Sequence, residues 1–591
     1  MLSEVLMIYF LKKSTPTKKG TYLQIYINYY DANTKKKKTK SYKSIGYVND
    51  LIKSGVADPI AYYSEQVKKL NEDLKQTQEL QISDKSLTKN LGYFLVKAMF
   101  DKLDMDEHLN ILSSTFKCRY KFSELFRTMV YAQIVNPGSK AKAFERVIPN
   151  IYGSKEYTYD QILDFINYVG MDYHKYIEVL NHHITNNWER EYKKVYFDCT
   201  NYYFEIDLED NFRKKGPSKE NRRCPIMGQA LLLDGNQIPL DTEYYPGNES
   251  EKPYLRKRIE DMKSRNNVRG KVIHVADKGL NCARNIYSAV VEARDGYIFS
   301  RSIKGTSIDE ETRKWLLEDK GDWVSVKDEH GLTKYKYKVE KWKKRDGSIQ
   351  DYGKYRYHCK INPEDEQEEE FEVKEKRIFT YNPKLAAKQK AEINREIDKL
   401  ENSLSFRTVL KEELGDMAKY VNVASIDENG KKVRIVTSIN EEKVKAALDL
   451  AGYNLLVTSE IHANPIDIYE TYHNLWRIEE SFRLLKTYLE ARPVFLSTEE
   501  TVYGHFTICY IALTLMRLLE FKTFKDKIPA SQLFDFVRDF NVTEAPNGVY
   551  INNATNALLV SKIKDVIGHS KLGNVYLTKT IIDSFLNTEL D

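Results

Sequence analysis

Cysteine is scarce in this chain: six of its 591 residues are cysteines, and no two of them form a C-x-x-C pair. Closely spaced pairs are the usual sign of a zinc site, and dense cysteines in a short chain are typical of a disulfide framework. Neither is indicated here. Reduced thiols in the cytosol are the simplest explanation, so we expect a cytoplasmic protein.

Long hydrophobic runs are also missing. The longest, Phe506–Met516, is too short to cross a bilayer and is bounded by His505 and Arg517, so we expect a buried core helix. Glu4 interrupts the early apolar stretch, which therefore does not look like a signal peptide. The sequence predicts a soluble protein with no membrane partner.

A large excess of one charge is missing as well. Lys and Arg total 92 against 86 Asp and Glu, and the resulting net charge of +6 is too small to name a nucleic-acid partner by itself. The chain is too long for one ordinary domain, and several domains, each with an adequate core, are expected.

The basic residues are unevenly distributed. Residues 1–60 are predicted to be β-rich, and a turn between two of the strands carries five lysines from Lys35 to Lys40. A solvated loop is one interpretation of this cluster. The other is an electrostatic contact with DNA phosphates, which would make the affinity fall as the salt concentration rises.

Two short apolar runs each end in an aspartate: Val195–Phe197 precedes Asp198, and Val272–Ala276 precedes Asp277. A carboxylate at the end of a buried strand lies at the rim of the sheet, where α/β folds place ligands. A single aspartate in such a place more often caps a turn. Two of them, followed by a further acidic helix, favour a functional site.

The segment Tyr472–Lys486, YHNLWRIEESFRLLK, places three polar side chains at intervals of seven residues. Because seven residues of an α-helix return to within about 20° of the starting direction, Tyr472, Glu479 and Lys486 would share one face. This set suits a metal site that faces a phosphate, whereas Glu480 is rotated by about 100°. An ordinary buried amphipathic helix is the alternative.

In this order, the segments resemble the DDE cut-and-paste transposases of bacterial insertion sequences, specifically the insertion-sequence-four-like group. The signature of that group is Y-x2-R-x3-E-x6-K, and Tyr472, Glu479 and Lys486 have its spacing. Other phrases that look like this group are VNPGSKAKAFE, PLDTEYYPGNESE, VADKGLN, WRIEESF and HFTICYIALTLMRLLE. The resemblance covers roughly residues 90–525.

One position departs from the signature, because Leu475 stands where the family has an arginine. The change removes one expected phosphate contact. Arg477 and Arg483 are the nearby residues that would replace it. The contacts to DNA phosphates predicted from the resemblance are Tyr472, Lys486 and Arg483.

The resemblance implies an α/β ribonuclease-H-like catalytic core with a β-rich insertion ahead of the catalytic glutamate. It also implies two Mg²⁺ ions, or Mn²⁺ in their place, held by Asp198, Asp277 and Glu479, with Asp198 bridging them. The reaction would be cleavage at transposon ends followed by strand transfer. The partners would be double-stranded DNA, as terminal inverted repeats and as target, and a second copy of the chain, in the cytosol or nucleoid of a bacterium.

Six parts are predicted along the chain. Glu479 follows Asp277 by 202 residues, whereas Asp198 and Asp277 are 79 residues apart, so an inserted subdomain is expected in the longer interval. The parts are a basic β-rich N-terminal module (1–60), a helical DNA-end-binding region (61–190), the first part of the core (191–294), a β-rich insertion (295–455), the second part of the core (456–525) and a helical C-terminal tail for dimerisation (526–591).

Two other functions remain open from the sequence. A DNA-binding protein of transposon ancestry that has lost catalysis would fit the departure at Leu475. A ribonuclease-H-like nuclease without strand transfer would fit the acidic residues. The intact set of Asp198, Asp277 and Glu479 favours the enzyme, because a protein that only binds DNA has no need of three convergent acids.

Overall fold

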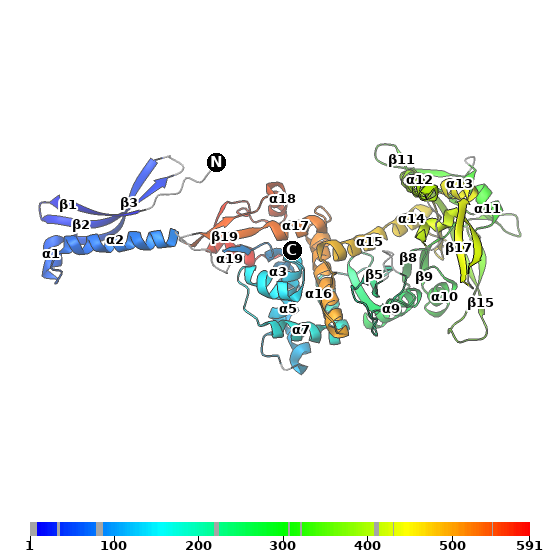
Figure 1. The fold of residues 1–591 in the computed structure, drawn as a ribbon, viewed down its shortest axis with the longest axis horizontal. Coiled ribbons are helices and arrows are strands. Elements are labelled where there is room, and N and C mark those ends of the chain that lie inside the picture. Colours follow the sequence, from blue (N-terminus) through cyan, green and yellow to red (C-terminus); the bar gives the residue numbers. More distant parts are fainter. Residues whose placement is uncertain are drawn as a thin grey trace. The chain divides into compact units, whose positions relative to one another are not determined.

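The chain forms two compact units in the computed structural model (Figure 1). The smaller unit comprises residues 1–89, 542–553 and 574–582, and the larger unit comprises the rest. The structure describes residues 9–31, 36–78, 87–116, 118–217, 224–304, 308–318, 322–406, 413–428, 431–545 and 548–590.

The smaller unit begins with an antiparallel sheet and two helices. Its elements are β1 (Tyr9–Thr17), β2 (Gly20–Asp31), β3 (Lys36–Tyr47), α1 (Val48–Lys53) and α2 (Pro59–Gln78). Asn71 in α2 binds the backbone of Phe10 in β1 twice, through Oδ1 at 2.7 Å and Nδ2 at 2.9 Å. These contacts join α2 to the sheet, so the boundary predicted at residue 60 separates elements that pack together.

A second sheet of this unit contains strands from both ends of the chain. It has the order β21 (Tyr576–Thr578), β20 (Val549–Asn552), β19 (Asn541–Ala545) and β4 (Thr88–Asn90). The hydroxyl oxygens of Thr88 and Thr543 lie 2.8 Å apart. The tail predicted to be helical therefore also contains three strands. These strands are short, and their pairing partners lie far away in the sequence, so local periodicity gives no signal for them.

The larger unit opens with a helical layer, as the apolar periodicity predicts. Its helices are α3 (Phe94–Leu103), α4 (Asp106–Leu112), α5 (Phe122–Val135), α6 (Lys140–Lys142), α7 (Tyr159–Met171) and α8 (Tyr173–Asn187). α7 crosses α16 (Glu499–Leu518) at two glycines. A Cβ on Gly170 would lie 1.6 Å from the carbonyl oxygen of Glu500, and one on Gly504 would lie 2.0 Å from that of Ile166. Only glycine permits this approach.

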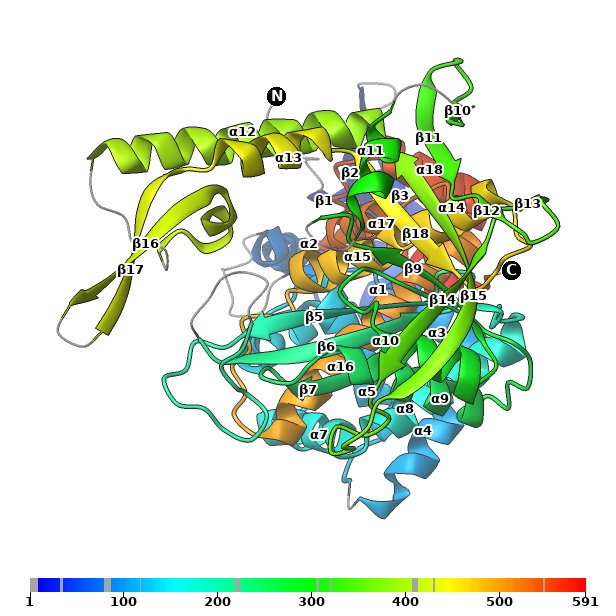
Figure 2. The same cartoon turned by 90° about the vertical axis from the view of Figure 1, so that its right-hand side faces the viewer.

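A mixed sheet of ten strands forms the centre of the larger unit (Figure 2). Its main path is β10-β11-β15-β18-β9-β8-β5-β6-β7, and β14 pairs with β15. β5, β8 and β9 are mutually parallel, and the other pairs are antiparallel. The bounds are β5 (Lys194–Tyr203), β6 (Ile226–Leu233), β7 (Pro239–Pro246), β8 (Ile273–Ala276), β9 (Gly296–Arg301), β10 (Val324–Lys327), β11 (Thr333–Val339), β14 (Gly353–Cys359), β15 (Glu369–Tyr381) and β18 (Tyr453–Thr458).

The predicted insertion is not separate from the central sheet, although it also contains the two-stranded sheets β12-β13 and β16-β17. Its strands β11 and β15 continue the central sheet, and β9, placed in the insertion by the boundary predicted at residue 294, pairs with β8. A hairpin and two helices of the same segment have their own small apolar core and extend away from the sheet (Figure 2). The remaining elements of the segment are α11 (Glu310–Leu317), β12 (Trp342–Lys343), β13 (Ile349–Gln350), α12 (Pro383–Phe406), β16 (Val421–Glu428), β17 (Lys431–Ile439) and α13 (Glu441–Asp449).

Helices cover both faces of the sheet around β5. α9 (Lys252–Arg265) and α10 (Ala283–Tyr287) share one apolar core with Val195, Phe197 and Cys199 of β5. α16 packs on the other face, where the ring of Phe506 lies 4.6 Å from that of Tyr202. The helices that complete the unit are α14 (Pro465–His473), α15 (Trp476–Arg483), α17 (Ala530–Asp539) and α18 (Ala557–Ile567). α19 (Lys579–Leu586) begins in the smaller unit and ends in the larger one.

Among the described residues, one helix is long and apolar enough to cross a membrane, and it is α16 with the turn that follows it, Glu499–Thr523. Its apolar window is 94% buried inside the protein. The apolar run within it was predicted to be a core helix, and its burial is that of a core helix.

Candidate active site

Strand register brings the two predicted aspartates to the same level. β5 and β8 run in parallel with Phe197 opposite Ala276, so Asp198 and Asp277 occupy the next pair of positions. Neighbouring strands lie about 4.8 Å apart, which makes the two backbones immediate neighbours at this level. The sequence predicted both aspartates at strand ends. This holds for Asp277, which directly follows β8, but is wrong for Asp198, because β5 continues to Tyr203. The parallel pairing that brings them together is a property of the fold.

The same level continues into β9. Ala276 is opposite Phe299, so Asp277 is followed across the sheet by Ser300. The Ser300 hydroxyl donates to Asp277 Oδ1 at 2.7 Å. Sequence reasoning missed Ser300, because a lone serine within a buried strand has no local signature.

Tyr472 reaches Asp277 from the helix above. Its hydroxyl donates to Asp277 Oδ1 at 2.8 Å. Burial raises the pKa of Asp277, but the hydrogen bonds from Ser300, the Lys278 backbone and Tyr472 outweigh it, so the net pKa lies below the ordinary value. Burial, followed by the charge of Asp277, raises the pKa of Tyr472 and keeps its proton in place. Asp277 is therefore held as an oriented carboxylate.

The segment predicted as one helix is interrupted. α14 ends at His473, α15 begins at Trp476, and the last part, Leu484–Tyr488, is a π-helical turn. Residues 475, 477 and 478 bond back by three positions rather than four, which tightens the chain at this point. The seven-residue spacing therefore does not by itself place Tyr472, Glu479 and Lys486 on one face of a single helix. The directions of these side chains depend on how α14, α15 and the π-helical turn pack in the fold.

α15 lies against β5, the strand of Asp198. Ile478 and Phe482 are buried, whereas Glu479 is exposed. At the end of the segment, Lys486 Nζ lies 5.3 Å from the centre of the Tyr202 ring. Tyr202 shares the sheet face of Asp198, because residues two apart in a strand point the same way. The fold thus brings Lys486 to that face, and it packs α15, the helix that carries Glu479, against β5.

Glu480 has a structural environment that differs from that of Glu479. Its carboxylate accepts from the guanidinium of Arg517 at 3.0 Å, and Arg517, whose side chain is 0% exposed, also pairs with Glu520 at 2.6 Å. Burial raises the pKa of Glu520, and Arg517 opposes that rise. This network fixes α15 to α16 through Glu480.

The position that departs from the family signature is apolar and buried. Leu475 is 6% exposed. Arg477 stacks on Trp476, with 4.1 Å from guanidinium to ring, and pairs with Asp526 at 2.6 Å. Arg483 has a side chain that is 63% exposed, and its contact with Glu480 is 3.4 Å. Arg483 is thus the more accessible of the two arginines.

The donor set fits a divalent ion that completes its shell with substrate. Within the described residues, no three His, Cys, Asp or Glu side chains form a ready metal site. Mg²⁺ is commonly bound by one or two carboxylates together with water and phosphate oxygens. Asp198 and Asp277, at one level of adjacent strands, supply such a pair. The Cys199 N–H donates to Asp198 Oδ1 at 2.8 Å and orients that carboxylate.

Three helices hold the turn that follows Lys486. Gln133 in α5 donates to the carbonyl oxygen of Leu489 at 2.7 Å, and His505 Nε2 in α16 donates to that of Ala491 at 3.1 Å. Arg538 in α17 donates to the neighbouring carbonyl at residue 488. Burial lowers the pKa of His505 well below its ordinary value, so the imidazole stays neutral. These positioning residues are far apart in the sequence and gave no motif.

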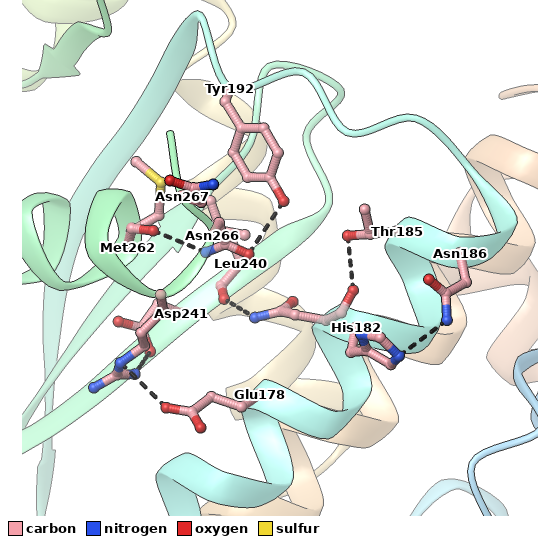
Figure 3. A pocket seen from close by; sticks show the side chains of 12 residues that line it. Glu178, His182, Thr185, Asn186, Tyr192, Leu240, Asp241, Met262, Asn266 and Asn267 are labelled. Atoms are coloured by element: carbon pink, nitrogen blue, oxygen red, sulfur yellow. Dashed lines mark hydrogen bonds and ion pairs between the residues drawn. The ribbon is translucent and has the colours of Figure 1, made fainter. Parts of the chain in front are cut away.

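A polar pocket of about 510 Å³ lies between α8, β7 and the end of α9 (Figure 3). Its walls are joined by Glu178 and Arg265, 3.3 Å apart, and by the Tyr192 hydroxyl, which donates to Asn266 at 3.2 Å. β7 is two strands away from β5 in the sheet. None of the six predicted site residues lines this pocket.

Comparison with known proteins links part of the chain to a transposase. A probable transposase for insertion sequence element IS5377 from Geobacillus stearothermophilus is 31% identical over 110 residues, which are 18% of this chain and 29% of that protein. The match thus spans less than a third of the relative's length. No protein-family model matches the chain. The local similarity supports a relationship to transposases.

Among solved structures, a piggyBac transposase synaptic complex with hairpin DNA aligns with a TM-score of 0.35 and 10% identity. The alignment covers 85% of each chain. A TM-score this low does not establish a shared fold.

Proposed function

We propose that this protein is a DNA transposase that cleaves transposon ends and joins them to target DNA by a cut-and-paste route. The observation that carries the proposal is the register of β5 and β8, which brings Asp198 and Asp277 to one level with α15 alongside. The local similarity to a probable transposase supports it.

The fold proposed for the core is ribonuclease-H-like. The order β7-β6-β5-β8-β9 has three antiparallel strands followed by two parallel ones, with α9 between β7 and β8. This arrangement supports the assignment, and the helices on both faces of the sheet agree with it. Membership of the insertion-sequence-four-like group is also part of the proposal. The chain has the spacing of that group's signature but carries Leu475 in place of its arginine.

Asp198, Asp277 and Glu479 would hold the Mg²⁺ ions, and Mn²⁺ would substitute. Divalent ions bound there would neutralise phosphate charge and lower the pKa of the attacking water or hydroxyl. Tyr472 and Ser300 fix the orientation of Asp277 through their hydrogen bonds.

The chemistry has two phosphoryl-transfer steps. A water oxygen bonds to phosphorus at the transposon end while the bond from phosphorus to the 3′ oxygen breaks, which leaves a 3′ hydroxyl. That hydroxyl would then attack a phosphodiester of the second strand, which releases the end, or of the target DNA, and in each case it displaces the 3′ oxygen of the bond that breaks. Lys486 and Arg483 would bind phosphate oxygens during both steps, Arg483 from its exposed position. Both DNA ends must be joined, so a homodimer on double-stranded DNA in the bacterial cytosol belongs to the proposal.

The test is incubation of the full chain with Mg²⁺ and duplex DNA that flanks its own gene, with mapping of the cut positions. Wild type should cut at the element ends and join them to a second duplex. Asp198→Asn, Asp277→Asn and Glu479→Gln should not, while Glu470→Gln, an exposed carboxylate change in α14, should behave like wild type.

Three outcomes separate the candidate functions. Binding without any cut by wild type would favour a DNA-binding protein that has lost catalysis. Cuts without joining would favour a nuclease without strand transfer. Cutting that persists in the three carboxylate variants would contradict the proposed site.

A further inference from the structure

The three-stranded sheet of the smaller unit has one face that packs on helices and one that does not. Leu23 and Ile25 of β2 are buried, and Lys12 of β1 donates to the carbonyl oxygen of Ile60 in α2 at 2.7 Å. These positions face the helices. Since successive residues of a strand point to opposite sides, the even-numbered residues of β2 from Tyr22 onward lie on the outer face.

A row of polar side chains crosses this outer face. Lys13, Gln24 and Ser44 are opposite one another on β1, β2 and β3. The Gln24 amide donates to the Ser44 hydroxyl at 3.3 Å, and Lys13 Nζ lies 5.5 Å from the centre of the Tyr26 ring. Lys13 and Ser44 are exposed. The contacts confirm that these side chains share one side.

A second row lies four residues away from the first along β1 and β2. Asn28 is opposite Tyr9 on β1 and Thr39 on β3, and the Thr39 hydroxyl donates to Asn28 Oδ1 at 2.6 Å. Tyr9 is 43% exposed. The two rows therefore present amide, hydroxyl and phenol groups, and Leu11, 43% exposed, lies between them opposite Tyr26. The polar groups can give up hydrogen bonds to one another and form hydrogen bonds to a ligand instead.

The charge of this segment is strongly one-sided. Residues 9–47 contain ten lysines and a single acidic residue, Asp31. Such a concentration of positive charge attracts a polyanion, in contrast to the nearly balanced charge of the whole chain. Lys13 lies on the outer face, whereas Lys12, Lys40 and Lys43 are opposite Ile25 or Ile27 on the side toward the helices. These lysines would act on a polyanion through the field of the whole segment.

The dimensions fit the major groove of duplex DNA. Three strands at about 4.8 Å spacing span about 10 Å, and the groove of B-DNA is about 12 Å wide and accepts β-structure. Gln and Asn side chains pair bidentately with adenine, and Lys pairs with guanine or phosphate. The major groove of an RNA duplex is too deep and narrow for such contacts.

We propose that the outer face of β1, β2 and β3 binds the major groove of duplex DNA and reads its sequence through Gln24 and Asn28, with Lys13 supplying charge. The inference deepens the proposed function and rests on it for the identity of the sequence, which would be the transposon end. It places sequence recognition in the N-terminal sheet instead of the helical region 61–190.

The experiment compares the affinity of the full chain for two labelled duplexes, one from the DNA flanking the gene and one with the same bases scrambled. The double variant Gln24→Ala with Asn28→Ala should lose about 10- to 100-fold of the preference for the flanking duplex, with the salt dependence unchanged. Lys13→Ala should weaken binding to both duplexes alike. It should also reduce the slope of log affinity against log salt concentration by about one.

Matched controls come from the helices of the same unit. Asn49→Ala in α1 and Lys68→Ala in α2 change exposed side chains of the same types. They should leave both affinities and the preference unchanged. Circular dichroism of every variant checks that the unit stays folded.

The inference is overturned if the double variant keeps the wild-type preference, if wild type has no preference, or if an RNA duplex of the same sequence binds more tightly. Cleavage measured on the same samples separates the two proposals. If wild type prefers the flanking duplex but does not cleave it, DNA recognition by the outer face of β1, β2 and β3 would be supported and the transposase activity contradicted. If wild type cleaves and the double variant keeps the wild-type preference, the transposase activity would be supported and recognition by this face contradicted.

Discussion

The two faces of β5 carry different kinds of side chain. Val195, Phe197 and Cys199 are buried in an apolar core with α9 and α10. The opposite face carries Asp198 and Tyr202, and the Tyr202 ring lies against Phe506 of α16 and 5.3 Å from Lys486 Nζ. The apolar face stabilises the strand, and the polar face uses that rigidity to present a carboxylate. Changes on the first face should therefore reduce stability, and changes on the second should reduce activity.

The largest effect is expected for Asp198→Asn on the polar face. Loss of a metal-binding charge should slow single-turnover DNA cleavage about 10³-fold or more, since charge stabilisation at such sites amounts to several kcal/mol. The melting temperature should change little, because the two side chains have the same shape. If Asp198→Asn also lowered the melting temperature substantially, the polar face of β5 would serve stability as well as activity, which would contradict this comparison.

Phe197→Ala is the reciprocal change on the apolar face. The cavity should reduce the free energy of unfolding by about 3 to 5 kcal/mol, measured by urea denaturation. The cleavage rate per folded molecule should stay close to that of wild type. A large rate loss without a stability loss would show that the apolar face also serves the site.

Arg517→Met tests the ion network under α15. Removing one partner of a buried pair should cost about 3 kcal/mol of unfolding free energy, because Glu520 is left buried and charged. The folded-state pKa of Glu520 is already raised and should rise further, so stability should recover as the pH falls through that pKa. Glu520→Gln should restore part of the loss at neutral pH. If the free energy of unfolding of Arg517→Met did not rise as the pH falls, the proposed role of Glu520 would be contradicted.

Tyr472→Phe removes one hydrogen bond to Asp277. Hydrogen bonds to charged groups contribute about 1.5 kcal/mol or more, so cleavage should slow about tenfold. The lowered pKa of Asp277 means that the carboxylate is lost only as the pH falls through that folded-state value. In the variant the pKa of Asp277 moves up toward its ordinary value, so the acid limb of the rate profile should shift to higher pH. An acid limb at the same pH as in wild type would show that Tyr472 does not influence the ionisation of Asp277.

Arg483→Ala should have the smallest effect. Because the side chain is 63% exposed and its ion pair is long, stability should stay within about 0.5 kcal/mol. DNA affinity should fall slightly, with a smaller salt slope. Lys486→Met is the comparison, and it should weaken cleavage more than Arg483→Ala. If Arg483→Ala slowed cleavage more than Lys486→Met, Arg483 would be the more important phosphate contact.

Much of the arrangement around the site could be predicted from local patterns. The apolar runs before Asp198 and Asp277 predict strands, and β5 and β8 occupy those positions. The apolar block around Phe506 predicts a buried helix, as observed in α16. These patterns depend on burial, which leaves a periodic trace in the sequence.

Other features depend on contacts between distant residues and could not be predicted. The parallel pairing of β5 with β8 and the bond from Ser300 to Asp277 arise from the sheet topology. The break between α14 and α15 arises where tertiary contacts override helical spacing. The metal roles of Asp198, Asp277 and Glu479 stay predictions.

The central claim is that Asp198 binds a divalent ion, and metal rescue of Asp198→Cys tests it most directly. A thiolate binds Mg²⁺ poorly and binds Zn²⁺ or Co²⁺ well. We predict that Asp198→Cys cleaves the flanking DNA poorly with Mg²⁺ and regains activity with Zn²⁺ or Co²⁺, while Asp198→Ala stays inactive with every ion. Wild-type cleavage by Asp198→Cys in Mg²⁺, or no advantage over Asp198→Ala in any metal, would contradict the account.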